Sequence, residues 1–589
     1  MERLYPPPGA RSETRLRARR GDERAALHQV NETATPDASS APCLSASERL
    51  IKAAGLDVSW SSISETCREL PPFFEAQFEA AVRTVLIHAS GYPVRISFLL
   101  NGSGVPRPAE SIGRNAMAQL VTTENVLASC EISDGTQASA RIEHDAVLIW
   151  IDDLRCPDPH VNPYASWAKG FLYTHHPVLL DALRQRRTDR INRAMIARMA
   201  KQRRGRAQVS FPGRNGPAPS RTILFCLYWL DFGGAEAFAL QTMQAAREAG
   251  FNVVVACDED GRHRLLERAS QVADAIYLLG SFGAGLSIEE AYLRIIRKHQ
   301  PAVIHIHHSR MTYRLLPAIR ALGLTHGVID TTHILEHRMA GFVGEATRYS
   351  EYVDRHHVIS HHLADLMTGM DVDDDRIRLG KLHDLSKSFE PQPDKWSATK
   401  PLNIAFVGRF QQQKRPYLFL QVAKQLVHRF GRDAFRFTAI GEGRLRVATE
   451  RLAAHLGLSD LVEFLPGTAP VQETLGHAHV LLIPSDNEGL TLVAFEAVRA
   501  GCIVISSDVG AQREIVVPEL LVPHRPRPCV VQMVERVTRL LEGSIDAGAV
   551  LERQKQKLEE NLAEPTGVDV CLAFYREIME RKAIDVSAA

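Results

Sequence analysis

Two glutamates separated by seven residues, Glu488 and Glu496, are the most informative chemical feature of the chain. The apolar run 480–483 before them predicts a strand, and the apolar spacing after them predicts a helix that begins near Leu490. Glu488 is then expected in the strand-to-helix loop, and Glu496 roughly two turns into the helix, at most about 12 Å further along. Free amides at the helix start, from Gly489 to Thr491, would face an anion between the two carboxylates. A ligand with a diol, phosphates and a sugar would fit, which describes a nucleotide sugar.

Each glutamate also has a simpler interpretation. Glu488 could be a favourable charge near a helix N-terminus. Glu496 lies among apolar residues and could be a partly exposed surface position. Other positions in the chain decide between these interpretations.

Two cations follow another predicted strand, Leu402 to Val407. Arg409 and Lys414 lie in the loop after this strand. A nucleoside diphosphate can leave only if its charge is neutralised, and two cations at a strand end can do this. The alternative is a pair of ordinary surface cations.

Two further sites follow strands of the preceding region. Gly233 and Gly234 open a helix after the predicted strand Thr222 to Tyr228, and their lack of side chains would let backbone amides approach a diphosphate. His333 follows a short predicted strand, Val328 to Asp330, and could contact an acceptor or the transferring sugar. A glycine turn or a lone histidine is more often structural.

Composition excludes several classes of function. The chain has 589 residues, a net charge of +1 and 45% hydrophobic residues, which is typical of a globular protein without a field that selects nucleic acid. Its nine cysteines are scattered without a CxxC pair, which indicates buried thiols in a reducing compartment. No apolar stretch is long enough to span a bilayer, and the N-terminus lacks a signal-peptide core. We therefore expect a cytoplasmic protein.

Apolar strand-like runs alternate with helical patterns from Arg221 onward. This alternation predicts parallel sheets covered on both faces, and its two series predict two doubly wound α/β domains that face a ligand cleft. The expected organisation is a basic tail (1–45), an accessory α/β domain ending in a basic helix (46–206), a linker (207–220), a first doubly wound domain (221–390), a second (391–565) and a C-terminal helix and tail (566–589).

The accessory region contains two ambiguous features. Residues 181–206 carry many arginines with interleaved apolar residues, which fits either a basic amphipathic helix on anionic lipid or a solvated connecting helix. Asp152 and Asp153 follow a predicted strand and could form an acidic metal site, although a two-residue acidic turn is common.

Taken together, the motifs resemble the retaining GT-B glycosyltransferases of family 4, of the glycosyl transferases group 1 type. The resemblance covers residues 221–580 and rests on Gly-Gly-Ala-Glu at 233–236, Val-Gly-Arg at 407–409 with Lys414, Gly-Glu-Gly at 441–443, and the spaced glutamates. The segment 380–384 departs from it, because it lacks the Asn-Gly-Val-Asp that is common there.

The resemblance implies a role for each matching residue. Arg409 and Lys414 would hold the diphosphate, Glu496 the ribose hydroxyls, and Glu488 the transferring sugar. The amides of 489–491 and of Gly233 and Gly234 would bracket the phosphates, and His333 would lie near sugar and acceptor. Neither a metal nor a cofactor would be needed.

The sequence therefore predicts a retaining hexosyltransferase that uses a nucleoside-diphosphate sugar. Its acceptor would be a glycan or a lipid-linked molecule in surface polysaccharide assembly, with peripheral contact to an anionic membrane at its inner face. Two alternatives stay open: a noncatalytic scaffold on a GT-B frame, and a metal-dependent transferase that uses Asp152 and Asp153.

Overall fold

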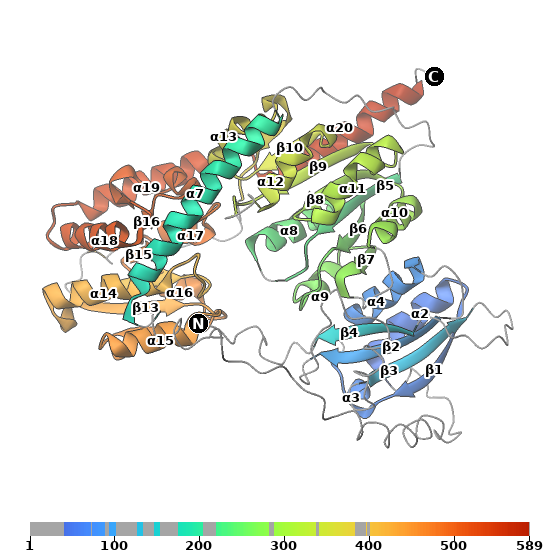
Figure 1. Ribbon diagram of the computed structural model, residues 1–589, viewed down its shortest axis with the longest axis horizontal. Helices are drawn as coiled ribbons and strands as arrows, with labels where there is room; N and C mark the ends of the chain where they lie inside the picture. Colours follow the sequence, from blue (N-terminus) through green and yellow to red (C-terminus); the bar gives the residue numbers. More distant parts are fainter. Residues whose placement is uncertain are drawn as a thin grey trace, which may run out of the picture.

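The computed structural model describes residues 41–587 with internal gaps, and Figure 1 shows three sheets that follow one another along the chain. The gaps are residues 72–73, 89–93, 102–125, 134–145, 153–172, 174, 204–219, 232, 282–287, 337–340, 383–395 and 397–400. The expected tail before residue 41, the linker 207–219 and Asp153 lie outside the described residues.

The first sheet belongs to an upstream domain with its own apolar core. Its order is β1-β3-β2-β4, with β3 antiparallel to both neighbours and β2 parallel to β4. Helix α4 packs with this core and also contacts β7 of the next domain. The elements are η2 (Pro42–Leu44), α2 (Ser45–Ala53), β1 (Asp57–Ile63), α3 (Glu65–Arg68), α4 (Glu75–His88), β2 (Val94–Asn101), β3 (Val126–Ser133) and β4 (Ala146–Asp152).

The second sheet forms the first α/β domain, with seven parallel strands in the order β11-β10-β9-β8-β5-β6-β7. Its strands are almost entirely buried because helices cover both faces. They are β5 (Ser220–Leu227), β6 (Asn252–Cys257), β7 (Ala275–Leu278), β8 (Pro301–His307), β9 (Gly327–Thr332), β10 (Arg355–Val358) and β11 (Ile377–Leu379). The helices are α8 (Gly234–Glu248), α9 (Leu266–Ser270), α10 (Ile288–His299), α11 (Arg310–Ala321), α12 (Gly341–Arg348) and α13 (His361–Gly369).

The third sheet forms the second α/β domain, with six parallel strands in the order β14-β13-β12-β15-β16-β17. Its strands are β12 (Leu402–Val407), β13 (Phe435–Ile440), β14 (Val462–Leu465), β15 (Val480–Ile483), β16 (Ile503–Ser507) and β17 (Leu521–Val522). Its helices are α14 (Pro416–Phe430), α15 (Arg446–His455), α16 (Val471–His477), α17 (Leu492–Arg499), α18 (Pro526–Leu541) and α19 (Ala547–Leu562). Together the two parallel sheets confirm the predicted GT-B architecture.

The C-terminal helix returns to the first α/β domain. Helix α20 (Gly567–Ser587) contacts α8 and strands β8 to β11, and the backbone of Lys381 pairs with that of Thr566 where the chain crosses back. One apolar core is continuous through both α/β domains and includes side chains of α20.

A long helix from the upstream region, α7 (Pro177–Arg203), crosses both α/β domains (Figure 1). It contacts α14 and α18 of the second domain and α12 of the first. Its face toward these domains is partly buried, whereas Leu179, Leu183 and several arginines are exposed. No helix in the described part of the chain is long and apolar enough to cross a membrane.

Candidate functional site

The loops after β12 and β15 bring Lys414 and Glu488 together. These strands are parallel neighbours, so their carboxyl ends lie side by side. The ammonium of Lys414 lies 2.7 and 2.8 Å from the two carboxylate oxygens of Glu488. The Glu488 side chain is buried, at 4% exposure, and that of Lys414 is 20% exposed. The pair thus unites two predicted site residues in a largely desolvated contact.

The Glu488 loop also meets the first α/β domain. A β-carbon on Gly489 would lie 1.9 Å from the carbonyl oxygen of His333, so only glycine permits this approach. The side-chain amide of Asn487 donates to the carbonyl of Leu335 at 2.6 Å. The backbone of His333 therefore packs against the Glu488 loop at Gly489.

Helix α17 begins at Leu492, two residues later than the sequence predicted. Thr491 is its N-cap in extended backbone, and its hydroxyl accepts a hydrogen bond from Gln512 at 2.7 Å instead of capping the helix. Glu496 is consequently about one turn into the helix, not two, and is partly buried. The loop from Gly489 to Thr491 is longer than expected for the same reason.

Arg409 is exposed on the loop after β12, and its charge acts on Glu236 of the first α/β domain. Burial raises the pKa of Glu236, while its own backbone amide, the indole N–H of Trp229 and Arg409 act in the opposite direction. The indole nitrogen lies 3.0 Å from a Glu236 carboxylate oxygen. A carboxylate of the first α/β domain and a guanidinium of the second are therefore near enough to interact electrostatically.

The glycines at the start of α8 lie next to the same carboxylate. Gly233 is the N-cap of α8 and is exposed with Gly234. A β-carbon on Gly233 would lie 2.1 Å from a Glu236 oxygen, so the carboxylate folds over the helix start. The predicted glycine turn thus lies beside Glu236, on which the charge of Arg409 also acts.

His333 belongs to a group of buried histidines beneath the cleft. Its ring lies 5.2 Å from that of His308 and 5.7 Å from Phe238, measured between centroids. Burial lowers the pKa of His333 well below its usual range, and the neighbouring His308, His307 and His357 lower it further. A neutral imidazole at this position can accept or donate a hydrogen bond without adding charge.

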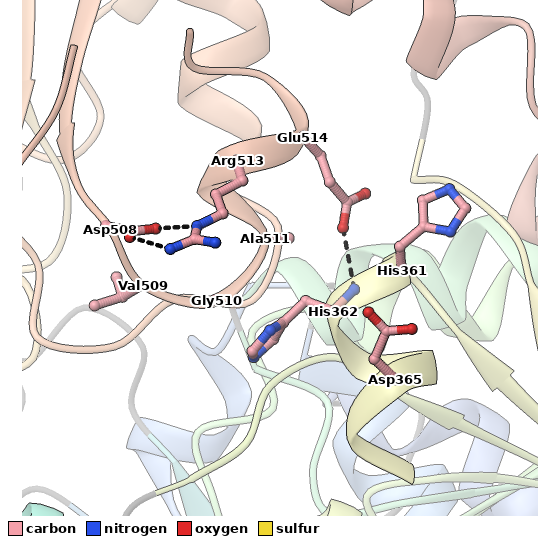
Figure 2. A pocket seen from close by; sticks show the side chains of 9 residues that line it. All are labelled: His361, His362, Asp365, Asp508, Val509, Gly510, Ala511, Arg513 and Glu514. Atoms are coloured by element: carbon pink, nitrogen blue, oxygen red, sulfur yellow. Dashed lines mark hydrogen bonds and ion pairs between the residues drawn. The ribbon is translucent and has the colours of Figure 1, made fainter. Parts of the chain in front are cut away.

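A cavity of about 430 Å³ lies between α13 and the turn after β16 (Figure 2). Asp508 binds the guanidinium of Arg513 at 2.7 and 2.5 Å, and Glu514 accepts the backbone N–H of His362 at 3.3 Å. A β-carbon on Gly510 would lie 1.9 Å from the carbonyl oxygen of Glu488, so this turn packs directly against the Glu488 loop. Carboxylates, a guanidinium and imidazoles suit a hydroxyl-rich ligand. The cavity is lined by His361, His362, Asp365, Asp508, Val509, Gly510, Ala511, Arg513 and Glu514.

Sequence reasoning missed Glu236 as a site residue, and it missed Arg415 and Asp486, which flank the Lys414–Glu488 pair. Glu236 follows the quoted glycine turn directly and could have been selected from that motif. Arg415 is fully buried, which is rare for arginine. No sequence pattern indicates that this arginine is buried.

The metal alternative depends on Asp153, which lies outside the described residues. Within the ranges that the structure describes, no group of three or more His, Cys, Asp or Glu side chains is arranged to hold a metal ion. Asp152 ends β4 in the upstream domain, whereas Arg409, Lys414 and Glu488 lie in the second α/β domain.

Comparison with known proteins finds family matches for both α/β domains. Residues 232–379 match the family model "Glycosyltransferase Family 4", and residues 401–543 match "Glycosyl transferases group 1". D-inositol 3-phosphate glycosyltransferase of Frankia alni is 37% identical over 150 residues, which cover 23% of this chain and 36% of that protein. The Saccharomonospora viridis protein of the same name is 31% identical over 188 residues, covering 30% and 43%.

The chain spans 36% and 43% of the length of these two curated relatives. Among solved structures, sucrose-phosphate synthase from Thermosynechococcus elongatus is 18% identical, with a TM-score of 0.47 over 61% of this chain and 100% of that one. A glycosyltransferase from Rickettsia africae is 14% identical, with a TM-score of 0.47 over 62% and 99%.

The two matched segments coincide with the two parallel-sheet domains, and the matches follow the order of the motifs along the chain. The two α/β domains therefore belong to the GT-B glycosyltransferases of the family 4 type.

Proposed function

We propose that this protein is a retaining glycosyltransferase that moves a sugar from a nucleoside-diphosphate sugar to a glycan or lipid-linked acceptor. The observation that supports this best is the contact between Lys414 and Glu488 at neighbouring strand ends, with Arg409 on the same loop as Lys414. An ammonium has three N–H donors, so Lys414 can hold Glu488 and a diphosphate oxygen together.

Each residue has a role in this proposal. Arg409 and Lys414 neutralise the leaving diphosphate, and the amides from Gly489 to Thr491 face it. Glu488 contacts the transferring sugar, and Glu496 accepts hydrogen bonds from the ribose diol. The reaction uses the side-chain cations in place of a metal.

The acceptor side includes the neutral His333 and the polar cavity beside Glu488. The curated relatives are named as D-inositol 3-phosphate glycosyltransferases. A polyol phosphate is therefore an acceptor class to test beside glycans and lipid-linked sugars, and surface polysaccharide assembly is the process that we propose.

We also propose that the protein works in the cytoplasm, in peripheral contact with an anionic membrane. Leu179 and Leu183 are 57% and 58% exposed on the outward side of α7, next to the exposed Arg186, Arg187 and Arg190. Such a face combines apolar insertion with attraction to anionic headgroups. Sedimentation with phosphatidylglycerol vesicles but not with phosphatidylcholine vesicles is expected, and equal sedimentation with both would contradict it.

The central test is a thermal-shift screen with UDP, GDP, ADP and their sugars. A ligand at a hundred times its Kd stabilises the folded state by about 2.7 kcal/mol, which gives a clear shift. One nucleoside diphosphate should stabilise the protein and identify the base, and the matching sugar donor should be turned over. A protein that no nucleotide stabilises would instead be a scaffold on a GT-B frame.

A further inference from the structure

The N-terminal half of α7 docks into the second α/β domain through polar side chains. Asp181, Gln185 and Thr188 are buried and recur at helical spacing, so they lie on one face of the helix. This face contacts α14 and α18. Buried polar groups are costly unless they are paired. Thr188 donates to the carbonyl of Arg184 within the helix, whereas Asp181 and Gln185 find a partner in the second domain.

The partner at the centre is Arg415, whose side chain is fully buried. Its guanidinium lies 2.7 Å from Asp181 and 3.0 Å from Asp486, and it donates to Gln185 at 2.8 Å. Arg184 completes the group, at 2.8 Å from Asp181 and 2.7 Å from Asp486. Two aspartates and two arginines thus form a closed, electrically balanced ring, in which α7 supplies one residue of each charge.

The ring is adjacent to the Lys414–Glu488 pair in both loops. Arg415 directly follows Lys414, and Asp486 lies two residues before Glu488. Between them, the backbone N–H of Asp486 donates to the carbonyl of Gln413 at 2.7 Å. A displacement of the ring would therefore move both loops that present the pair.

The backbone of Arg415 is itself unusual. It has φ of +53° at the N-cap of α14, a left-handed conformation that non-glycine residues seldom adopt. The ion pairs of its side chain hold it there, because the surrounding structure must over-determine such a conformation. Lys414 is the neighbouring residue, so its direction depends on this conformation.

We propose that Asp181 and Arg184 are positioning residues of the donor site, so that the catalytic unit begins with α7. This helix lies ahead of residue 232, where the family matches begin. The proposal rests on the proposed function, because the geometry that α7 fixes is that of Lys414 and Glu488. Both residues act through Arg415 and Asp486 and touch no substrate.

Asp181→Asn tests the proposal, with Asp181→Glu as the conservative variant. A control is available on the same helix: Asp189 is partly exposed and lies 3.6 Å from His524, so Asp189→Asn removes a charge outside the ring. Calorimetry measures the affinity for UDP, GDP and ADP, and steady-state assays separate kcat from KM. We expect Asp181→Asn to weaken nucleotide affinity about tenfold, Asp181→Glu to recover part of the loss, and Asp189→Asn to match the wild type.

A double-mutant cycle with Lys414→Ala separates positioning from general destabilisation. If α7 acts through the Lys414 loop, Asp181→Asn has little further effect on affinity once Lys414 is removed. Equal effects of Asp181→Asn with and without Lys414, or wild-type affinity in a folded Asp181→Asn, would overturn the proposal. Arg184→Met, at a side chain that is 27% exposed, repeats the cycle if Asp181→Asn does not fold.

The two proposals fail in different ways. A wild-type protein that binds none of the three nucleoside diphosphates contradicts the proposed function and this inference together. A wild-type protein that binds one of them, with an additive cycle for Asp181→Asn, or for Arg184→Met where Asp181→Asn does not fold, contradicts only the role of α7.

Discussion

At the scale of single residues, a substitution of Lys414 removes two interactions at once. In the proposed function it holds a diphosphate, and in the structure it is the cation of the buried Glu488. Arg409 is exposed, and its charge acts on Glu236 of the first α/β domain instead. The two cations of one loop are therefore not equivalent, although their sequence positions suggest a simple pair.

We expect Lys414→Ala and Arg409→Ala both to weaken the binding of the nucleoside diphosphate while the fold survives. Each loses a charged contact, on the order of 2 kcal/mol, and Lys414→Ala also leaves a buried carboxylate without its partner. Calorimetry should thus show the larger loss for Lys414→Ala. Lys424→Ala, at an exposed position of α14, is the control. Wild-type affinity in both site variants would contradict the assignment.

Substitution by glutamine should affect different quantities at Glu488 and at Glu496, namely turnover at the first and nucleotide affinity at the second. Glu488→Gln is expected chiefly to reduce kcat, with nucleotide binding nearly intact. Glu496→Gln should weaken the nucleotide by roughly 1–3 kcal/mol, because a carboxylate accepts two hydrogen bonds from a buried diol and an amide offers one acceptor. Calorimetry with the free nucleoside diphosphate separates the two roles.

Glu473→Gln, on the exposed side of α16, controls for the loss of charge alone. If Glu488→Gln abolishes nucleotide binding and Glu496→Gln does not, the donor binds in the reverse orientation, with its ribose at Glu488 and its sugar at Glu496. If neither changes binding or rate, the spaced glutamates serve only the helix and its loop.

Residue types and spacing were sufficient to place Lys414 and Glu488 in loops after parallel strands, but their ion pair was not predicted, because it depends on β12 and β15 being neighbours in the sheet. They were insufficient for Arg415 and Asp181, which lie 234 residues apart and meet only through the docking of α7. An alternation of strands and helices defines a sheet edge, but it does not indicate which distant helix will cover that edge.

At the scale of elements, the long β-α alternation predicted most strands of both α/β domains closely. The edge strands β11 and β17 were not predicted, since runs of three and two residues have no measurable periodicity. The start of α17 was placed too early because Leu490 is apolar and nearly buried, yet it packs in the loop before the N-cap Thr491. Apolar spacing alone does not distinguish these cases.

The loop before α17 connects the two α/β domains through Asn487, and this contact is testable. Its amide N–H donates to the carbonyl of Leu335. Asn487→Asp would place two acceptors face to face, so we expect kcat/KM to fall about tenfold or more, a loss of 1–3 kcal/mol. Asn487→Ala should be milder. Calorimetry should show nearly unchanged affinity for the nucleoside diphosphate, whose cationic contacts lie on another loop. Unchanged kcat/KM in Asn487→Asp would show that this contact does not matter for turnover.

At the scale of the whole molecule, the chain ties its two α/β domains together at several points. It returns to the first domain through α20, and α7 lies across both. Lys381, which is fully buried at the crossing, pairs with Glu514 of the cavity turn. Segments from both ends of the described chain therefore contact the two α/β domains.

Transfer should persist in EDTA, because Arg409 and Lys414 supply the positive charge that a leaving diphosphate needs. The assay compares initial rates with and without the chelator after removal of free metal. A complete loss of activity that Mn²⁺ or Mg²⁺ restores would favour the alternative at Asp152 and Asp153 over the site described above.

The buried histidines under the cleft make the stability of the molecule dependent on pH. Burial lowers the pKa of His308 and of His357 to about 4. As the pH falls below about 6.5, these histidines become protonated in the unfolded chain but stay neutral in the folded protein. Stability is therefore full above pH 6.5 and decreases as the pH falls toward 4.

His307 tests this dependence without the loss of a hydrogen bond. Neither of its ring nitrogens has a hydrogen-bond partner among the residues that the structure describes, and its ring lies between Phe225 and Phe238 at 5.9 and 6.0 Å. Burial lowers its pKa well below the usual range, and its histidine neighbours add to this. His307→Phe should therefore raise Tm, and by more at pH 5 than at pH 8. The difference should approach about 2 kcal/mol, which is 1.5 pH units at 1.36 kcal/mol each. The exposed His428→Phe should show no such dependence. An equal change in Tm at both pH values would mean that His307 titrates alike in the folded and unfolded chain, contrary to its burial.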